Sequence, residues 1–191
     1  MNEYENKIYL MDSVIQDRTI SDNGILVYCY LQAIKQTDKS LYYVSIGSMS
    51  FFFDQIIGIS TKRKKKYIDG LNDLEEHGLI KKISSNVSDY IYDLSKLKLL
   101  NTKEFTVINI DDIGKIMQID DSEYSPDKIK LLRYFVFALS FLKECNSHTE
   151  TIESLVLKSG LSVNTILLYN KLLKKYDLLQ IEKISAIKCV R

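Results

Sequence analysis

The clearest pattern of apolar and polar positions along the chain lies in residues 58–83. Apolar residues recur there at three- and four-residue spacing, which predicts one apolar face on a helix: Tyr67, Ile68, Leu71 and Leu74. Ser60 stands in a helix-capping position, and Gly78 is the usual left-handed stop. We therefore expect a helix over residues 60–76, followed by a hairpin over residues 80–93.

The apolar pattern before this helix predicts three further elements. A helix begins at Ser21 or Asp22, and a short strand follows over residues 41–46. A second helix is expected over residues 48–57, with four side chains packing inward: Phe51, Phe52, Ile56 and Ile57. Phe53 is then expected to be exposed or to lie at an interface.

The same order of elements begins again about a hundred residues later. A strand over residues 105–110 echoes the apolar residues 8–10, and the turn at 160–162 repeats the turn at 58–60. The other elements of this second set are helices over residues 131–142, 151–158 and 162–176 and a short hairpin over residues 178–190. The repetition indicates an internal duplication.

Two domains follow from this duplication, residues 1–98 and 104–191, in a mainly helical fold of the α+β class. Each domain contains a pair of helices joined by a tight turn and followed by a hairpin. The first long helix of the second domain is expected to start at Ser125, with Ser125 as its cap and Pro126 at its first helical position.

Composition narrows the classes of protein that the sequence fits. The 191-residue chain has a formal net charge of +1, so no global basic field marks a nucleic-acid-binding protein, although one face can still be basic. The three cysteines are scattered and form no zinc motif with the two histidines, which favours a reduced, cytoplasmic setting. The N-terminus is too polar for a signal peptide, and the apolar run 131–142 is too short to cross a bilayer.

Catalytic and metal-binding motifs are absent from the sequence. It contains no phosphate-binding glycine-rich loop, no HExxH and no GxSxG. The paired carboxylates at 111–112 and 120–121 lack a third ligand, so we interpret them as turn and capping residues. His77 is expected to contact the last carbonyl groups of its helix. We therefore expect no enzymatic activity, no cofactor and no bound metal.

A basic run, KRKKK at residues 62–66, occupies the N-terminal half of the helix over 60–76. This is the half of a recognition helix that enters the major groove, where free amides and the helix dipole favour phosphate. On a helical wheel Lys62, Lys65 and Lys66 point away from the apolar face. We expect these lysines to contact DNA phosphates.

Other residues around the basic run extend this candidate interface. Arg63 is able to form two hydrogen bonds with guanine. The candidate DNA contacts of the first domain are Ser60, Thr61, Lys62, Arg63, Lys65 and Lys66 in the helix and Lys81, Lys82 and Asn86 in the hairpin. The alternative is a solvated helix face in which Lys65 pairs with Asp69.

The corresponding helix of the second domain has a neutral start. Asn164 and Thr165 are its candidate base contacts, because Asn can bond adenine through two hydrogen bonds. The alternative is that both residues only cap the helix. This second unit therefore either touches DNA weakly or serves dimerisation. The apolar helix over 131–142 fits a protein interface and a central core helix equally well.

The chain resembles the winged helix-turn-helix replication-initiation and DnaD-type proteins of plasmids and phages. The resemblance rests on Ile59 and Ser60, on residues 68–80 and on residues 160–179. It implies tandem winged helix-turn-helix domains in a non-enzymatic protein that binds double-stranded DNA at repeated or palindromic sites, usually as a homodimer. A replication-machinery protein is a further possible partner.

Two other functions fit the same residues. A transcriptional regulator would use the same fold and the same DNA contacts. A protein-interaction module of a replication or segregation complex would instead make DNA binding incidental, and the small net charge and the neutral helix over 162–176 favour this alternative.

Overall fold

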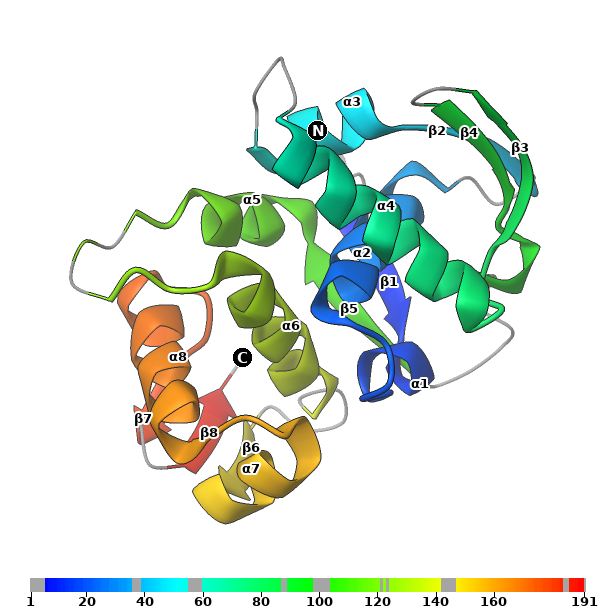
Figure 1. Ribbon diagram of the computed structural model, residues 1–191. Helices are drawn as coiled ribbons and strands as arrows, with labels where there is room; N and C mark the ends of the chain where they lie inside the picture. The colour runs from blue at the N-terminus through cyan, green and yellow to red at the C-terminus, as the bar shows by residue number, and fades with distance from the viewer. Residues whose placement is uncertain are drawn as a thin grey trace.

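The chain folds into a mainly helical α+β structure with small sheets (Figure 1). The computed structural model describes residues 6–35, 39–54, 60–86, 89–97, 104–120, 122, 124–141, 147–183 and 186–190. The turn residues Gly58 and Ile59, on which part of the sequence comparison rests, lie outside these ranges, as does Cys145.

The same order of elements occurs twice along the chain. The first half contains β1 (Lys7–Met11), α1 (Asp12–Ile15), α2 (Asp22–Ile34), β2 (Leu41–Ser45), α3 (Ile46–Asp54), α4 (Thr61–Glu76), β3 (Lys81–Asn86) and β4 (Asp89–Asp93), followed by the short 3-10 helix η1 (Ser95–Leu97). The second half contains β5 (Phe105–Asn109), α5 (Ile110–Gln118), α6 (Lys128–Ser140), β6 (Ser147–Thr151), α7 (Ile152–Ser159), α8 (Val163–Lys175), β7 (Ile181–Lys183) and β8 (Ala186–Val190). Each half thus presents a strand, two helices, a strand, two helices and a hairpin.

The two halves also share one sheet topology. In the first half the strands are ordered β2-β4-β3, and in the second half β6-β8-β7, with every neighbouring pair antiparallel. In each case the strand that precedes the pair of helices joins the second strand of the following hairpin, which is the central strand of the sheet. The hairpin is therefore anchored beside the helix pair rather than extending freely from it.

A third sheet joins the halves, and the sequence did not predict it. β1 pairs with β5 in antiparallel register, with Tyr9 opposite Val107. A shift of 98 residues (105 − 7) places the first residue of β1 on the first residue of β5, and the same shift carries Tyr9 onto Val107 (107 − 9 = 98). Equivalent residues therefore face each other at the centre of the pair, which is the pattern of a two-fold relation between the halves.

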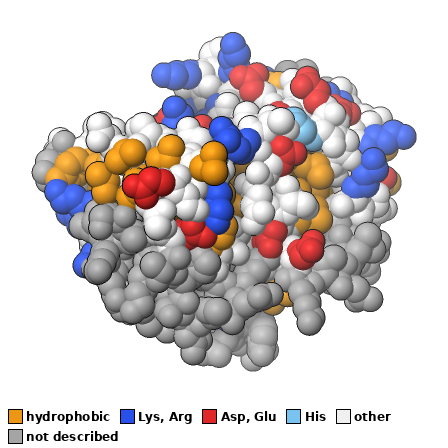
Figure 2. Space-filling view, turned by 90° about the horizontal axis from the view of Figure 1, so that it is seen from below, with side chains coloured by type: hydrophobic (Ala, Val, Ile, Leu, Met, Phe, Trp, Pro, Cys, Tyr) orange, Lys and Arg blue, Asp and Glu red, His pale blue; other side chains and the backbone are white. Residues whose placement is uncertain are grey.

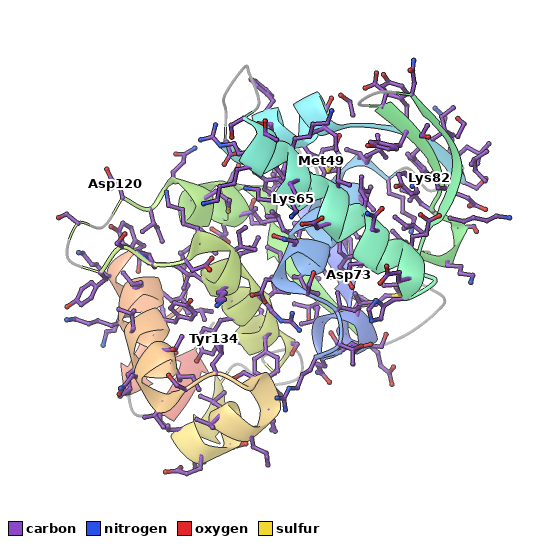
Figure 3. The ribbon with its side chains drawn as sticks, viewed as in Figure 1. Met49, Lys65, Asp73, Lys82, Asp120 and Tyr134 are labelled. Carbon is purple, nitrogen blue, oxygen red and sulfur yellow. The ribbon has the colours of Figure 1, made fainter. Side chains whose placement is uncertain are left out.

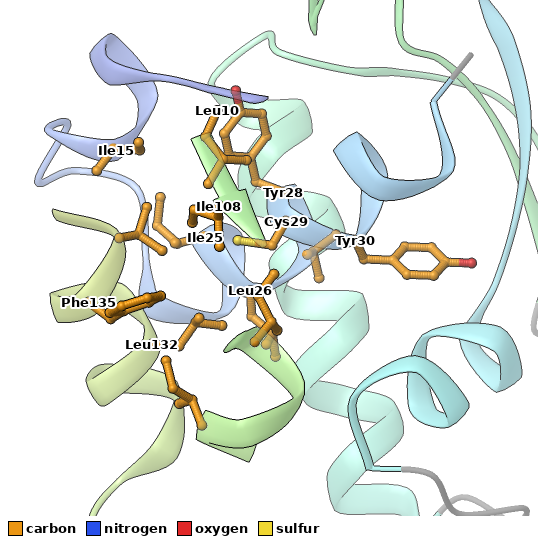
Figure 4. Packing of buried hydrophobic residues seen from close by; sticks show 14 of the residues in the cluster. Leu10, Ile15, Ile25, Leu26, Tyr28, Cys29, Tyr30, Ile108, Leu132 and Phe135 are labelled. Carbon is orange, nitrogen blue, oxygen red and sulfur yellow. The ribbon is translucent and has the colours of Figure 1, made fainter. Parts of the chain in front are cut away.

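One continuous core lies under both halves. Every residue of α2 from Gly24 to Leu31 is buried, because α4, α6 and β1 all pack around this helix. Figure 4 shows Ile25, Leu26 and Ile108 packed toward Leu132 and Phe135 of α6. The apolar helix α6 is thus a central core helix, which decides between the two alternatives that its sequence left open. The predicted division into residues 1–98 and 104–191 accordingly describes two halves that share a core.

The helical phase predicted for α3 was wrong for Phe51 and Phe53, whereas Phe52 packs against the core as predicted. Phe53 is 1% exposed and stacks on Tyr67 with ring centroids 6.1 Å apart, whereas Phe51 is 60% exposed. The helix begins at Ile46, directly after β2, so Ile46, Met49 and Phe53 form the buried face. The predicted inward residues Ile56 and Ile57 lie outside the described residues.

The start of α6 also differs from the prediction. Asp127, not Ser125, is the cap, and its carboxylate accepts hydrogen bonds from the backbone N–H groups of Ile129 and Lys130. Ser125 has φ of 38°, a left-handed conformation, whereas a helix N-cap has an extended backbone. The predicted cap lies two residues too early because aspartate is as good a cap as serine.

Candidate nucleic-acid interface

The N-terminal half of α4 presents its cations at the positive end of the helix dipole. Ser60 is the N-cap, and its hydroxyl accepts a hydrogen bond from the backbone N–H of Arg63 at 3.4 Å. Thr61, Lys62 and Lys65 are exposed in the two turns that follow, and Figure 3 labels Lys65 on this helix. The predicted helix, its cap and its apolar face are confirmed in position.

The two exposed lysines have no ionic partner in the part of the chain that the structure describes. Among the residues that the structure describes, neither Lys62 nor Lys65 forms an ion pair, and the pair between Lys65 and Asp69 that belongs to the alternative interpretation is not present. The explanation of this face as an ion-paired helix surface therefore does not apply to these two side chains. Both ammonium groups are available to a phosphate.

Lys66 does not point outward as predicted. Its ammonium lies 3.9 Å from Asp54 Oδ2 and 4.8 Å from the centre of the Tyr67 ring, with 19% of the side chain exposed. Burial lowers the pKa of Lys66, and the nearby Asp54 carboxylate partly opposes this effect. The reason for the error is that α3 ends at Asp54 beside the first turn of α4, which the helical wheel of α4 alone does not include.

Asp54 also faces Arg63 and Tyr67. The Arg63 guanidinium lies 3.7 Å from Asp54 Oδ2, and the Tyr67 hydroxyl donates a hydrogen bond to the same oxygen at 3.1 Å. Burial is the main cause that raises the pKa of Tyr67, so the hydroxyl stays a donor. Sequence analysis did not identify Asp54. Its carboxylate partly neutralises Arg63 and Lys66, so the exposed positive charge lies on Lys62 and Lys65.

The hairpin β3–β4 contributes less free charge than expected. Lys81 is exposed, but Lys82 lies 3.6 Å from Glu75 Oε2 and its backbone N–H donates to Glu75 Oε1 at 2.9 Å. Asn86 is exposed at the end of β3, opposite Asp89 in the register. These contacts fasten the hairpin to the last turns of α4, so Lys81 and Asn86 are positioned relative to the helix by the Glu75 contacts.

The second half presents a different surface at the equivalent place. Ser162 caps α8, accepting from the Thr165 N–H at 3.2 Å, and the two hydroxyl groups lie 2.9 Å apart. Thr165 is therefore engaged in the cap, as the capping alternative states, whereas the Asn164 side chain is exposed. Val163 is 46% exposed and Leu157, in α7, is 77% exposed. Hydrophobic side chains correspondingly gather on the left of the face in Figure 2, the side on which α7 and α8 lie in Figure 1.

No other candidate chemistry emerges in the described part of the chain. No group of three acidic, histidine or cysteine side chains comes close enough there to hold a metal ion. Asp111 and Asp112 lie in the first turn of α5, where they complement the helix dipole. Cys29 is fully buried, and burial raises the pKa of its thiol to about 12, so it is unreactive.

His77 links the end of α4 to the segment before α2. Its Nδ1 lies 2.8 Å from the Asp73 carbonyl oxygen, as expected for a helix-end residue, and its Nε2 lies 3.0 Å from the Thr19 hydroxyl. That hydroxyl donates to Asp17 Oδ1 at 2.6 Å, so its oxygen is the acceptor toward His77. Both ring nitrogens must then carry protons, and the bond to the Asp73 carbonyl is the main cause that raises the pKa of His77.

This arrangement predicts that part of the stability depends on pH. The pKa of His77 is raised in the folded state. Its contribution to the free energy of unfolding is therefore fully present below the ordinary pKa of 6.5 and is lost as pH rises through the higher folded-state pKa. We expect the difference in unfolding free energy between the wild type and His77→Gln to shrink between about pH 5.5 and pH 9, by a few tenths of a kcal/mol for this largely exposed group. Urea denaturation at both pH values measures it, and a difference that grows with pH would contradict the assigned protonation.

Comparisons with protein-family models and with curated proteins found no match to this chain. Within the described residues, none of the helices has both the length and the apolar character that crossing a bilayer requires.

Proposed function

We propose that this protein binds double-stranded DNA through the N-terminal half of α4 and the hairpin β3–β4. The observation that carries the proposal is the exposure of Lys62 and Lys65, without ionic partners among the described residues, at the positive end of a capped 16-residue helix. Lysines in this position bind phosphate, and a helix N-terminus adds its own favourable field.

The fold assignment that goes with this proposal is a tandem winged helix-turn-helix protein. In support, each half contains a helix, a strand, two helices and a hairpin, and each sheet has the same strand order. In such a protein the second helix of the pair lies in the major groove and the hairpin contacts the adjacent backbone. These elements are α4 with β3–β4 in the first half and α8 with β7–β8 in the second.

The biological role that we propose is that of an origin-binding, replication-initiator-like protein of a mobile element, acting without catalysis. It would bind repeated or palindromic duplex DNA, as a homodimer, and recruit replication proteins. A transcriptional regulator would make the same contacts, because fold and DNA interface are common to both roles. The two roles differ in the position of the preferred site, at a replication origin or at a promoter.

A protein-interaction module is the second candidate for one half of the molecule. The specific observation is that the start of α8 exposes Val163, whereas the start of α4 exposes Thr61, Lys62 and Lys65; α7 also exposes Leu157, as α3 exposes Phe51. An apolar surface of this kind favours a protein partner over phosphate. We therefore assign the DNA contacts to the first half and a protein contact to the second.

The experiment that tests DNA binding is a salt series on the full-length protein. Affinity for random duplex DNA and for repeat-containing DNA from beside its own gene would be measured by fluorescence anisotropy at several salt concentrations. Contacts from Lys62, Lys65 and Lys81 predict a log–log slope of about −2.7 for each bound protomer, at about 0.9 per phosphate. Tighter binding to the repeats would favour the initiator role, and a flat response without detectable binding would refute the DNA proposal.

A further inference from the structure

A hollow with four basic residues among the twelve that line it lies where the two halves meet. It measures about 200 Å³ and lies between the segment that follows α1, the start of α2, one face of α6 and the end of α7. Four basic side chains line it, Arg18, Lys130, Arg133 and Lys158, against a single carboxylate, Asp22. Figure 2 looks onto this lower side of the molecule, where Lys and Arg side chains lie between the apolar patch and a surface of mixed charge.

Two of these cations form part of the wall. Arg133 donates hydrogen bonds to the backbone carbonyls of Ile20 and Asp17, the latter at 3.0 Å, and pairs with Asp22 at 3.2 Å. Lys158 pairs with Glu150 at 2.6 Å. Both charges are therefore largely balanced by protein groups, and the single lining carboxylate is already engaged by Arg133.

Arg18 and Lys130 have fewer protein partners than Arg133 and Lys158. Arg18 donates one hydrogen bond to the Leu157 carbonyl at 3.2 Å, and its guanidinium lies against Gly160, where a Cβ atom would come within 3.0 Å of Arg18 Cζ. The Lys130 ammonium has no hydrogen-bond or ionic partner among the described residues, and its side chain is exposed at the rim. These two groups therefore bring charge and donors to the lining of the hollow that no carboxylate of the described residues neutralises.

We infer that this hollow binds a phosphate group, with Arg18 and Lys130 as its direct ligands. Guanidinium groups bind phosphate through parallel hydrogen bonds, and a lysine supplies a point charge beside them. The phosphate belongs either to a small phosphorylated molecule or to the backbone of DNA, because the recognising chemistry is the same.

Binding of inorganic phosphate to the full-length protein tests whether the hollow binds a small phosphorylated molecule. At constant ionic strength, with chloride as the reference salt, phosphate at ten times its dissociation constant should raise the melting temperature by about 3–6 °C. Lys130→Ala should weaken phosphate binding in calorimetry by about tenfold or more. Lys174→Ala is the matched control, since Lys174 is an exposed lysine in the last turn of α8 and does not line the hollow, and it should leave the affinity unchanged.

The salt dependence of duplex DNA binding tests whether the hollow binds a phosphate of the DNA backbone. If a backbone phosphate occupies the hollow, Lys130→Ala should reduce the log–log slope by about 0.9, again without an effect of Lys174→Ala. Phosphate stabilisation that depends on Lys130 supports the site even if the protein does not bind DNA at all. No response of either readout to Lys130→Ala would overturn the inference, and because Lys130 is exposed its removal should not prevent folding.

Discussion

Gly70→Ala should lower the free energy of unfolding by about 2 kcal/mol, which is a fall of about 4–8 °C in melting temperature for a chain of this size. Gly70 lies in α4 where this helix crosses α2. A Cβ atom at this position would come within 2.7 Å of Val27 Cγ2 and 2.8 Å of the Asn23 carbonyl carbon, and closer still to its oxygen. A backbone carbonyl in a helix cannot rotate away, so α2 and α4 must separate.

A matched glycine makes the result interpretable. Gly114 lies in α5, and a Cβ atom there would meet nothing within 4 Å. Gly114→Ala should therefore raise stability by about 0.5–1 kcal/mol, which is the ordinary helix-propensity gain. The same gain at Gly70 is outweighed by the steric cost. Thermal or urea denaturation of both variants measures the contrast, and equal stabilisation by both would show that α2 and α4 are not so closely packed.

Features that depend on neighbouring residues in the sequence were predictable. The bounds of α4 follow from Ser60 as its cap and from the glycine stop at Gly78, which has φ of 65°. The start of α8 follows from its cap Ser162 in the same way, although its end at Tyr176 carries no glycine. Capping and helical periodicity act over a few residues, so one sequence is enough to identify them.

Features that depend on contacts between distant segments were not predictable. The pairing of β1 with β5 joins residues about a hundred positions apart, and neither strand carries a signal for its partner. The strand β6 was missed, and α5 was interpreted only as turn and capping residues. Because short segments of this kind are specified by the sheet or core that they join, periodicity alone does not define them.

In the candidate site, too, some charges were predictable from the local sequence and others depend on contacts between distant segments. The sequence places Lys62, Lys65 and Lys66 on one side of a helix, and two of the three are exposed as expected. Lys66 instead faces Asp54, a residue of α3 whose position depends on the intervening turn. The site that the structure supports is therefore narrower than the basic run, because the tertiary fold supplies a carboxylate that the helical wheel omits.

Replacing Lys62 and Lys65 together by alanine should weaken binding to duplex DNA by roughly 10- to 100-fold and reduce the salt slope by about 1.8, at about 0.9 per lysine. Both side chains are exposed and make no ion pairs within the described residues, so folding should be unaffected. Loss of phosphate contacts should weaken binding to all sequences alike, whereas loss of base contacts would change the preference among sites.

The control must remove the same charge from elsewhere on the molecule. Lys115 and Lys174 lie exposed in the last turns of α5 and α8, so the double variant Lys115→Ala/Lys174→Ala also lowers the net charge by two. Its affinity should change by less than about threefold, since long-range charge effects are screened at physiological salt. If both double variants lost affinity equally, binding would reflect overall charge. If neither did, α4 would not be the DNA-binding element, and the exposed apolar residues Leu157 and Val163 would become the first place to seek a protein partner.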